Sequence, residues 1–193
     1  NNLYAIAQDY YRAIKEKFPR GLKIIAGWSM GGILATMVNY FFQQDEDNSV
    51  AVLMIDSESP ILFHSMSLLD YAKYIRNLFD QKLALQIPLN ELPSIEDLAL
   101  MPKEKQVHTL FGKANELIRE PGLADKKGSL ATIRGLLLGV LKFQLDRPIN
   151  NVHMITAKAT REQRGDARLG WPADKVNVEI LQEMPANHDS IML

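Results

Sequence analysis

The chain has 193 residues, of which 47% are hydrophobic and 23% are charged, and its formal net charge is −1. This length predicts one domain with room for a hydrophobic core, and the near-neutral charge gives no support for a nucleic-acid or membrane partner. The sequence has no cysteine, which excludes disulfides and thiolate metal sites and is compatible with the cytoplasm, where we expect the protein. No apolar run reaches the roughly 18 residues of a spanning helix. No metal-ligand spacing is present, so we expect no metal site.

The first sixty residues alternate between helix and strand patterns. Apolar residues recur at helical spacing over residues 3–18, and the short apolar run 22–26 predicts a strand. A second helical pattern covers residues 30–42, and the continuous apolar run 50–55 is typical of a buried parallel strand. This order of elements predicts an α/β fold.

The pattern is helical throughout residues 61–148. Ser94, Pro102 and Ser129 are candidate helix starts, and Pro121-Gly122 is a candidate helix end. A helical insertion of this length between two strands predicts a lid over an active site, and one long structural crossover is the alternative. One predicted inward-facing stripe consists of Leu68, Leu69, Ala72, Ile75, Leu78 and Phe79.

The sheet pattern resumes after this insertion. Residues 152–156 predict a strand, the polar stretch 158–174 predicts a loop, and the alternating residues 176–181 predict the last strand. Residues 184–188 follow as a loop, and 189–193 are expected to begin a final helix.

The segment Gly27-Trp28-Ser29-Met30-Gly31-Gly32 fits the pattern G-x-S-x-G between a predicted strand and a predicted helix. In such a nucleophile elbow, a strained turn exposes the serine hydroxyl, and glycines two positions before and after the serine let strand and helix approach closely. We therefore predict Ser29 as the nucleophile, with a structural Gly-Ser turn as the alternative. The Met30 N–H, at the helix N-terminus, is the predicted oxyanion donor.

A serine nucleophile needs a base, and the base needs an acid that orients it. His188 follows the last predicted strand, which is where hydrolases with this elbow carry the base. The other histidines are worse placed, because His64 opens the helical insertion, His108 lies on a polar helix face and His153 lies inside a strand. We predict His188 as the general base.

Asp56 is the predicted acid. It directly follows the strand 50–55, so its carboxylate should project at the same sheet edge as Ser29. Asp166 lies about ten residues beyond its strand and is the rival, and Glu58 is a weaker third candidate.

These residues resemble the thioesterase domains that terminate nonribosomal peptide synthetases and polyketide synthases, within the α/β-hydrolase superfamily. The elbow 27–32 resembles that family's elbow, with the tryptophan that is more typical of the peptide-synthetase branch. The strand 52–57 resembles the strand that delivers the catalytic aspartate early, and the helical stretch resembles the lid. Trp171, the strand after it and His188 resemble the family's closing segment.

The resemblance implies a mostly parallel α/β-hydrolase sheet flanked by helices, and release of an acyl or peptidyl chain by Ser-His-Asp catalysis, through hydrolysis or cyclisation. The acyl or peptidyl substrate would be carried on the phosphopantetheine of an acyl or peptidyl carrier protein domain in the same synthetase, and no bound cofactor is implied. A stand-alone serine esterase or lipase and a non-catalytic hydrolase-like module that binds acyl groups or proteins are the alternatives.

Two features depart from the family pattern. Ala186 stands where the family usually has glycine two residues before the histidine. The family's opening strands, whose loop donates the second oxyanion N–H, have no counterpart in the sequence, so we expect residues 1–193 to be one partial thioesterase domain.

Overall fold

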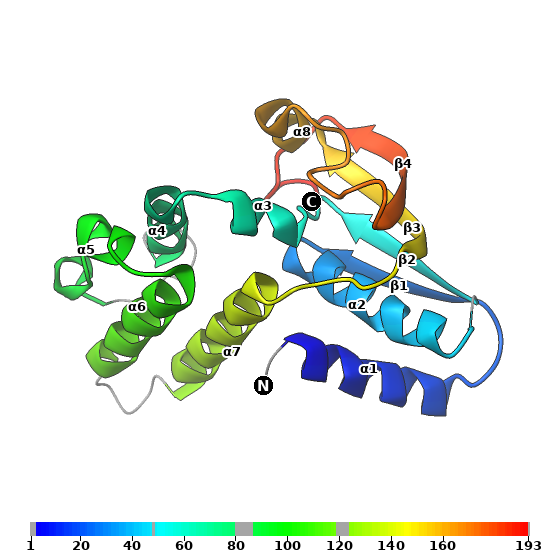
Figure 1. The fold of residues 1–193 in the computed structure, drawn as a ribbon, viewed down its shortest axis with the longest axis horizontal. Helices are drawn as coiled ribbons and strands as arrows, with labels where there is room; N and C mark the ends of the chain where they lie inside the picture. The colour runs from blue at the N-terminus through cyan, green and yellow to red at the C-terminus, as the bar shows by residue number, and fades with distance from the viewer. Residues whose placement is uncertain (1–2, 48, 80–86, 119–123, 193) are drawn as a thin grey trace. The chain divides into compact units, whose positions relative to one another are not determined.

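The computed structural model describes residues 3–47, 49–79, 87–118 and 124–192, and they form two compact units (Figure 1). The first unit joins residues 3–62 to residues 143–192 and contains the sheet. The second unit spans residues 63–142 and is helical in its described parts. The boundaries of the helical unit lie close to the limits 61–148 expected from the sequence.

Four strands form one parallel sheet in the order β1-β2-β3-β4. They are β1 (Lys23–Trp28), β2 (Val50–Ile55), β3 (Ile149–Ala157) and β4 (Val176–Met184). Each contains most or all of the strand predicted from the apolar pattern, and the predicted α/β fold with a parallel sheet is confirmed. Because all four strands are parallel, their carboxyl ends lie at one edge of the sheet.

Helices α1 (Leu3–Lys17) and α2 (Met30–Gln44) follow the predicted patterns. Helix α2 packs against β1 and β2, and α1 packs on α2 through aromatic pairs such as Tyr4–Phe41, whose ring centroids are 4.9 Å apart. In β2, Val50, Val52 and Met54 are fully buried, whereas the alternate residues are only half-buried. The apolar run of β2 is therefore fully buried on one face of the sheet only.

The helices after β2 are α3 (Pro60–Ser65), α4 (Leu68–Asn77), the 3-10 turn η2 (Leu89–Glu91), α5 (Ile95–Ala99), α6 (Lys103–Leu117) and α7 (Ala124–Leu141). Ser94 caps α5, accepting a hydrogen bond from the Asp97 N–H at 3.0 Å, and Pro102 directly precedes α6, as predicted. Ser129 lies inside α7, so its prediction as a cap is wrong. The predicted helix end at Pro121-Gly122 lies outside the described residues.

The predicted stripe on α4 is also partly wrong. Leu68 and Leu69 are exposed, and Tyr71 is buried together with Ala72 and Ile75. Ser67 caps the helix, and its buried face is set by the packing of Tyr71 rather than by the leucines of the first turn. Among the helices of the described ranges, none is long and apolar enough to cross a membrane.

Residues 158–164 form helix α8 (Lys158–Arg164), where the sequence predicted a loop. After β4, residues 189–192 form hydrogen-bonded turns rather than the predicted start of a helix, with Ile191 N–H donating to the Asn187 carbonyl at 3.1 Å. The first difference matters for the site, because α8 begins where β3 ends.

Candidate active site

Ser29 occupies a strained turn between β1 and α2. Its φ of 54° and ψ of −124° are rare for a residue with a side chain, and such strain is concentrated at functional sites. The Ser29 N–H still donates to the Ile55 carbonyl of β2 at 3.0 Å, so the turn is anchored to the sheet. The serine is thereby held at the carboxyl end of β1.

The glycines of the elbow are required for space at two positions. A Cβ on Gly27 would lie 2.1 Å from the Gly31 carbonyl oxygen, and one on Gly32 would lie 2.4 Å from Ser57 Oγ. A Cβ on Gly31 meets no heavy atom within 4 Å. The prediction for the glycine two residues before Ser29 thus agrees with the geometry, whereas after the serine the tight contact is at Gly32 and not at Gly31.

The structure brings Ser29, Asp56 and His188 together at the carboxyl ends of β1, β2 and β4. His188 Nε2 lies 2.9 Å from Ser29 Oγ, and His188 Nδ1 lies 2.8 Å from Asp56 Oδ2. With Asp56 ionised, Nδ1–H donates to the carboxylate and Nε2 accepts from the serine hydroxyl. This is the hydrogen-bond order of a Ser-His-Asp triad.

Asp56 has no solvent exposure, and its carboxylate accepts three hydrogen bonds. The donors are His188 Nδ1–H, the Thr160 hydroxyl at 2.7 Å and the Ala157 N–H at 2.8 Å. Burial alone raises the pKa of Asp56, but these hydrogen bonds outweigh it and hold the pKa below its usual value. The carboxylate is therefore ionised at neutral pH.

Two of those donors come from the start of α8. Ala157 ends β3, and Thr160 lies in the first turn of the helix. Between these two residues, the Ala159 N–H donates to the Ala186 carbonyl at 3.2 Å, in the loop that carries His188. Sequence reasoning missed Thr160 because it predicted a loop here; a hydroxyl residue just after a strand end was the one available signal.

Trp28 contacts His188 from the side of the elbow. Its indole stacks on the imidazole with ring centroids 5.3 Å apart and planes at 26°, and its Nε1–H donates to the His188 carbonyl at 3.2 Å. Sequence reasoning used Trp28 only as a mark of resemblance and gave it no part in the site.

Met30, the first residue of α2, has its N–H at the helix N-terminus beside Ser29, where backbone N–H groups have no intrahelical partner.

No family model matches the chain. Over 68 residues it is 40% identical to a thioesterase of Fusarium pseudograminearum, and over 62 residues it is 32% identical to a probable thioesterase, gloN, of Glarea lozoyensis. The matches cover 35% and 32% of this chain, and 27% and 22% of the two relatives. The chain thus matches about a quarter of the length of these curated relatives.

Solved structures extend the comparison to the whole fold. A four-domain nonribosomal peptide synthetase bound to AMP and glycine matches 99% of this chain and 15% of its own, with a TM-score of 0.60 at 21% identity. The NocB thioesterase domain of the nocardicin cluster matches all of this chain and 67% of its own, with a TM-score of 0.55 at 14% identity. The resemblance to thioesterase domains is confirmed. At these identities the solved structures bear on the fold alone, which this chain shares with thioesterase domains.

The rival acids of this thioesterase-like chain have other partners. Asp166 accepts from the Arg168 N–H at 2.9 Å and the Gly170 N–H at 2.7 Å, which closes its own loop. Glu58 forms a two-pronged ion pair with Arg164. Both carboxylates therefore have structural roles.

The three other histidines are also engaged away from Ser29. His64 Nε2 lies 2.9 Å from the Val140 carbonyl oxygen, His108 pairs with Arg134, and His153 lies 3.0 Å from Glu179.

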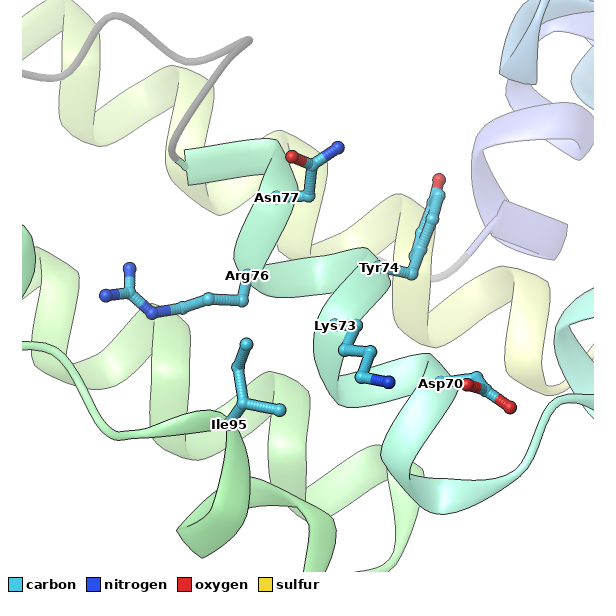
Figure 2. A pocket seen from close by; sticks show the side chains of 6 residues that line it. All are labelled: Asp70, Lys73, Tyr74, Arg76, Asn77 and Ile95. Carbon is cyan, nitrogen blue, oxygen red and sulfur yellow. The ribbon is translucent and has the colours of Figure 1, made fainter.

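A surface pocket of about 450 Å³ lies within the helical unit, between α4 and α5 (Figure 2). Figure 2 shows Arg76 extending from α4 above Ile95 of α5, with Lys73 and then Asp70 farther along α4. Asp70 already accepts from the Ser67 hydroxyl at 2.6 Å, and the pocket mixes both signs of charge. It shares no lining residue with the Ser29 site.

Among the described residues, no group of three or more His, Asp or Glu side chains could hold a metal ion.

Proposed function

We propose that this chain carries the catalytic residues of a thioesterase that releases an acyl or peptidyl chain from the phosphopantetheine arm of a carrier protein. The observation that supports it most is the continuous hydrogen-bond chain from Ser29 Oγ through His188 to the buried Asp56. The likeness to thioesterases over about a third of the chain favours a thioester over an oxygen ester as substrate.

In the proposed acylation, Ser29 Oγ attacks the thioester carbonyl as its proton passes to His188 Nε2. The new O–C bond forms, the carbonyl oxygen becomes an oxyanion, and the Met30 N–H donates to it. Collapse of this intermediate breaks the C–S bond, and His188 returns the proton to the departing pantetheine thiolate. Asp56 remains ionised throughout and stabilises the transient imidazolium.

Deacylation repeats these steps with a second nucleophile. His188 deprotonates either a water molecule or a hydroxyl or amine of the bound chain, and Ser29 leaves with the proton returned by His188. Water yields an acid, and an internal nucleophile yields a lactone or lactam. In this proposal the helical unit 63–142 serves as the lid that encloses the acyl chain, and the carrier protein domain is the partner.

The test is the intact mass of the protein after incubation with an acyl-N-acetylcysteamine thioester. We expect an increase equal to the acyl group on the wild-type chain and none on Ser29→Ala, because only the serine can form the acyl-enzyme. An adduct of the same size on Ser29→Ala, or none on the folded wild type, would contradict the proposal.

Two matched substrates define the class more closely. The corresponding oxygen ester should acylate Ser29 more slowly than the thioester if the protein is a thioesterase, and equal rates would favour a general serine esterase. An acyl group delivered on a holo carrier protein should react faster than the same group on N-acetylcysteamine. Equal reactivity of the two would argue against recognition of the carrier.

A further inference from the structure

Trp28 holds the histidine of the site in two ways. Its indole ring stacks on the His188 imidazole, with ring centroids 5.3 Å apart and planes at 26°. Its Nε1–H donates to the His188 main-chain carbonyl oxygen at 3.2 Å. Trp28 ends β1 and His188 follows β4, so the contacts join segments 160 residues apart in the chain. The side chain of the residue before Ser29 thus contacts both the ring and the main chain of the histidine that hydrogen-bonds to Ser29.

We propose that Trp28 is a positioning residue for His188, and that its ring also favours the imidazolium that forms when His188 takes the proton of Ser29. This inference rests on the proposed function for its catalytic consequence, but the contact between the two rings can be tested without it.

The first step is geometric. The hydrogen bonds of His188 to Asp56 and Ser29 leave from the two ring nitrogens, whose donor and acceptor directions lie in the plane of an imidazole. They fix the edges of the ring but resist tilting out of the plane only weakly, since a hydrogen bond tolerates moderate bending. The His188 side chain is 27% exposed, so it is not fully enclosed. Trp28 supplies a wall on one ring face, which limits this tilt.

The second step concerns the backbone of the His188 loop. Two hydrogen bonds hold this loop. The Ala159 N–H donates to the Ala186 carbonyl, and the Trp28 indole N–H donates to the His188 carbonyl. Trp28 is in turn fixed by its place in β1, where it pairs with Ile55 of β2. The loop is thus held by a donor from α8 at Ala186 and by a donor from the elbow at His188.

The third step is electrostatic. The faces of an indole carry negative charge density, so a cation stacked on the ring is stabilised, and tryptophan is the strongest of the aromatic residues in this respect. Trp28 is 40% exposed, so its cation–π interaction with the imidazolium should have the weaker strength that is typical of solvent-exposed pairs. We expect the ring to contribute about two- to fivefold in the rate of proton transfer. Asp56, on the ring edge, acts in the same direction.

Two replacements separate these effects. Trp28→Phe keeps an aromatic face and loses the N–H donor, and Trp28→Leu keeps apolar bulk and loses both. The first measurement is the NMR chemical shift of His188 Hε1, assigned by its loss in His188→Gln, because a proton over an indole face is shifted upfield by the ring current. The second is the rate at which a fluorophosphonate modifies Ser29, followed by intact mass.

We expect the upfield shift of His188 Hε1 to persist in part in Trp28→Phe and to disappear in Trp28→Leu. The modification rate should stay within about fivefold of wild type in the phenylalanine variant. It should fall on the order of ten- to a hundredfold in the leucine variant, because the base is no longer held in register with the serine. Thermal melts confirm folding, and Trp28→Met replaces the leucine variant if that one does not fold.

A leucine variant with wild-type reactivity and an unchanged His188 shift would overturn the proposal. Equal losses in the phenylalanine and leucine variants would overturn the part assigned to the ring and leave the N–H tie. If the wild type itself does not react, the proposed function fails, and the His188 shift in wild type against Trp28→Leu still decides whether the two rings are stacked.

Discussion

Replacing Thr160 with valine tests whether α8 holds the acid of the site. Valine keeps the β-branched shape of threonine and removes the hydroxyl that donates to Asp56 Oδ2 at 2.7 Å. Thr160 is only 7% exposed, so water has little access to replace the lost donor. Asp56 then keeps two of its three hydrogen bonds, those from His188 and Ala157.

The expected cost follows from the charge of the acceptor. A hydrogen bond to an ionised group contributes about 1.5–3 kcal/mol, so the free energy of unfolding at neutral pH should fall by about 2 kcal/mol. A less firmly held carboxylate also orients His188 less well. If about 1.4 kcal/mol of the loss is expressed in the transition state, acylation of Ser29 slows about tenfold.

The effect on stability should depend on pH. The pKa of Asp56 in the folded protein is below its usual value, so its contribution to stability is present above the unfolded pKa of about 3.9 and is lost as pH falls through the folded pKa. Thr160→Val removes one of the hydrogen bonds that lower this pKa. The stability gap between wild type and variant should therefore be largest at neutral pH and narrow below about pH 4.

Urea denaturation at several pH values measures this gap, and Thr160→Ser is the matched control because it keeps the hydroxyl and removes the methyl group. The serine variant should retain most of the stability and most of the rate of acylation. If valine is as stable as wild type at neutral pH, or if serine and valine lose equally, the hydrogen bond to Asp56 is not what Thr160 contributes.

Three further changes have specific expected outcomes. Gly32→Ala should lower the free energy of unfolding by about 1–3 kcal/mol, because its Cβ falls 2.4 Å from Ser57 Oγ, whereas Gly31→Ala should stay within about 1 kcal/mol of wild type; equal melting temperatures would contradict this difference. Ser94→Ala should cost about 1 kcal/mol by removing the cap of α5, seen as faster hydrogen exchange at the start of that helix, and unchanged exchange would count against the cap. Asn187→Ala removes the side-chain oxygen that accepts two N–H groups in the turn after the His188 loop, and it should slow acylation of Ser29 severalfold with a smaller effect on melting; a large loss of melting temperature at an unchanged rate would show a role in stability alone.

The parts of the fold that were predictable from the sequence are those with a strong period or a strong local rule. The apolar runs of β1 and β2 and the helical stripe of α2 were recognisable because burial within the sheet unit dictates them, and the stripe of α1 was recognisable because α1 packs on α2. The elbow added a motif with a required context, and chain order then led to Asp56 and His188, which the structure brings together with Ser29. Their catalytic roles remain a prediction.

The parts that were not predictable depend on contacts between distant segments. Helix α8 has seven residues, most of them polar, and no side-chain cap, so it has neither the period nor the start signal of a helix. Thr160 was missed for the same reason. The buried face of α4 was misjudged because leucines were assumed to point inward, while Tyr71 occupies that position. No local pattern could show that Trp28 stacks on a histidine from the other end of the chain.

The parallel order of the sheet also determines when the site can exist during folding. The hydrogen bond between His188 and Ser29 closes a loop of 159 residues, and that between His188 and Asp56 closes one of 132. Both need β3 to pair with β2 and β4 to pair with β3, and the β2–β3 pairing, as between Val52 and Val152, is the kind of non-local contact that slows folding. During refolding, Ser29 should therefore become reactive toward an acylating probe only after β4 has joined the sheet. The time at which this reactivity appears would report when the sheet is complete.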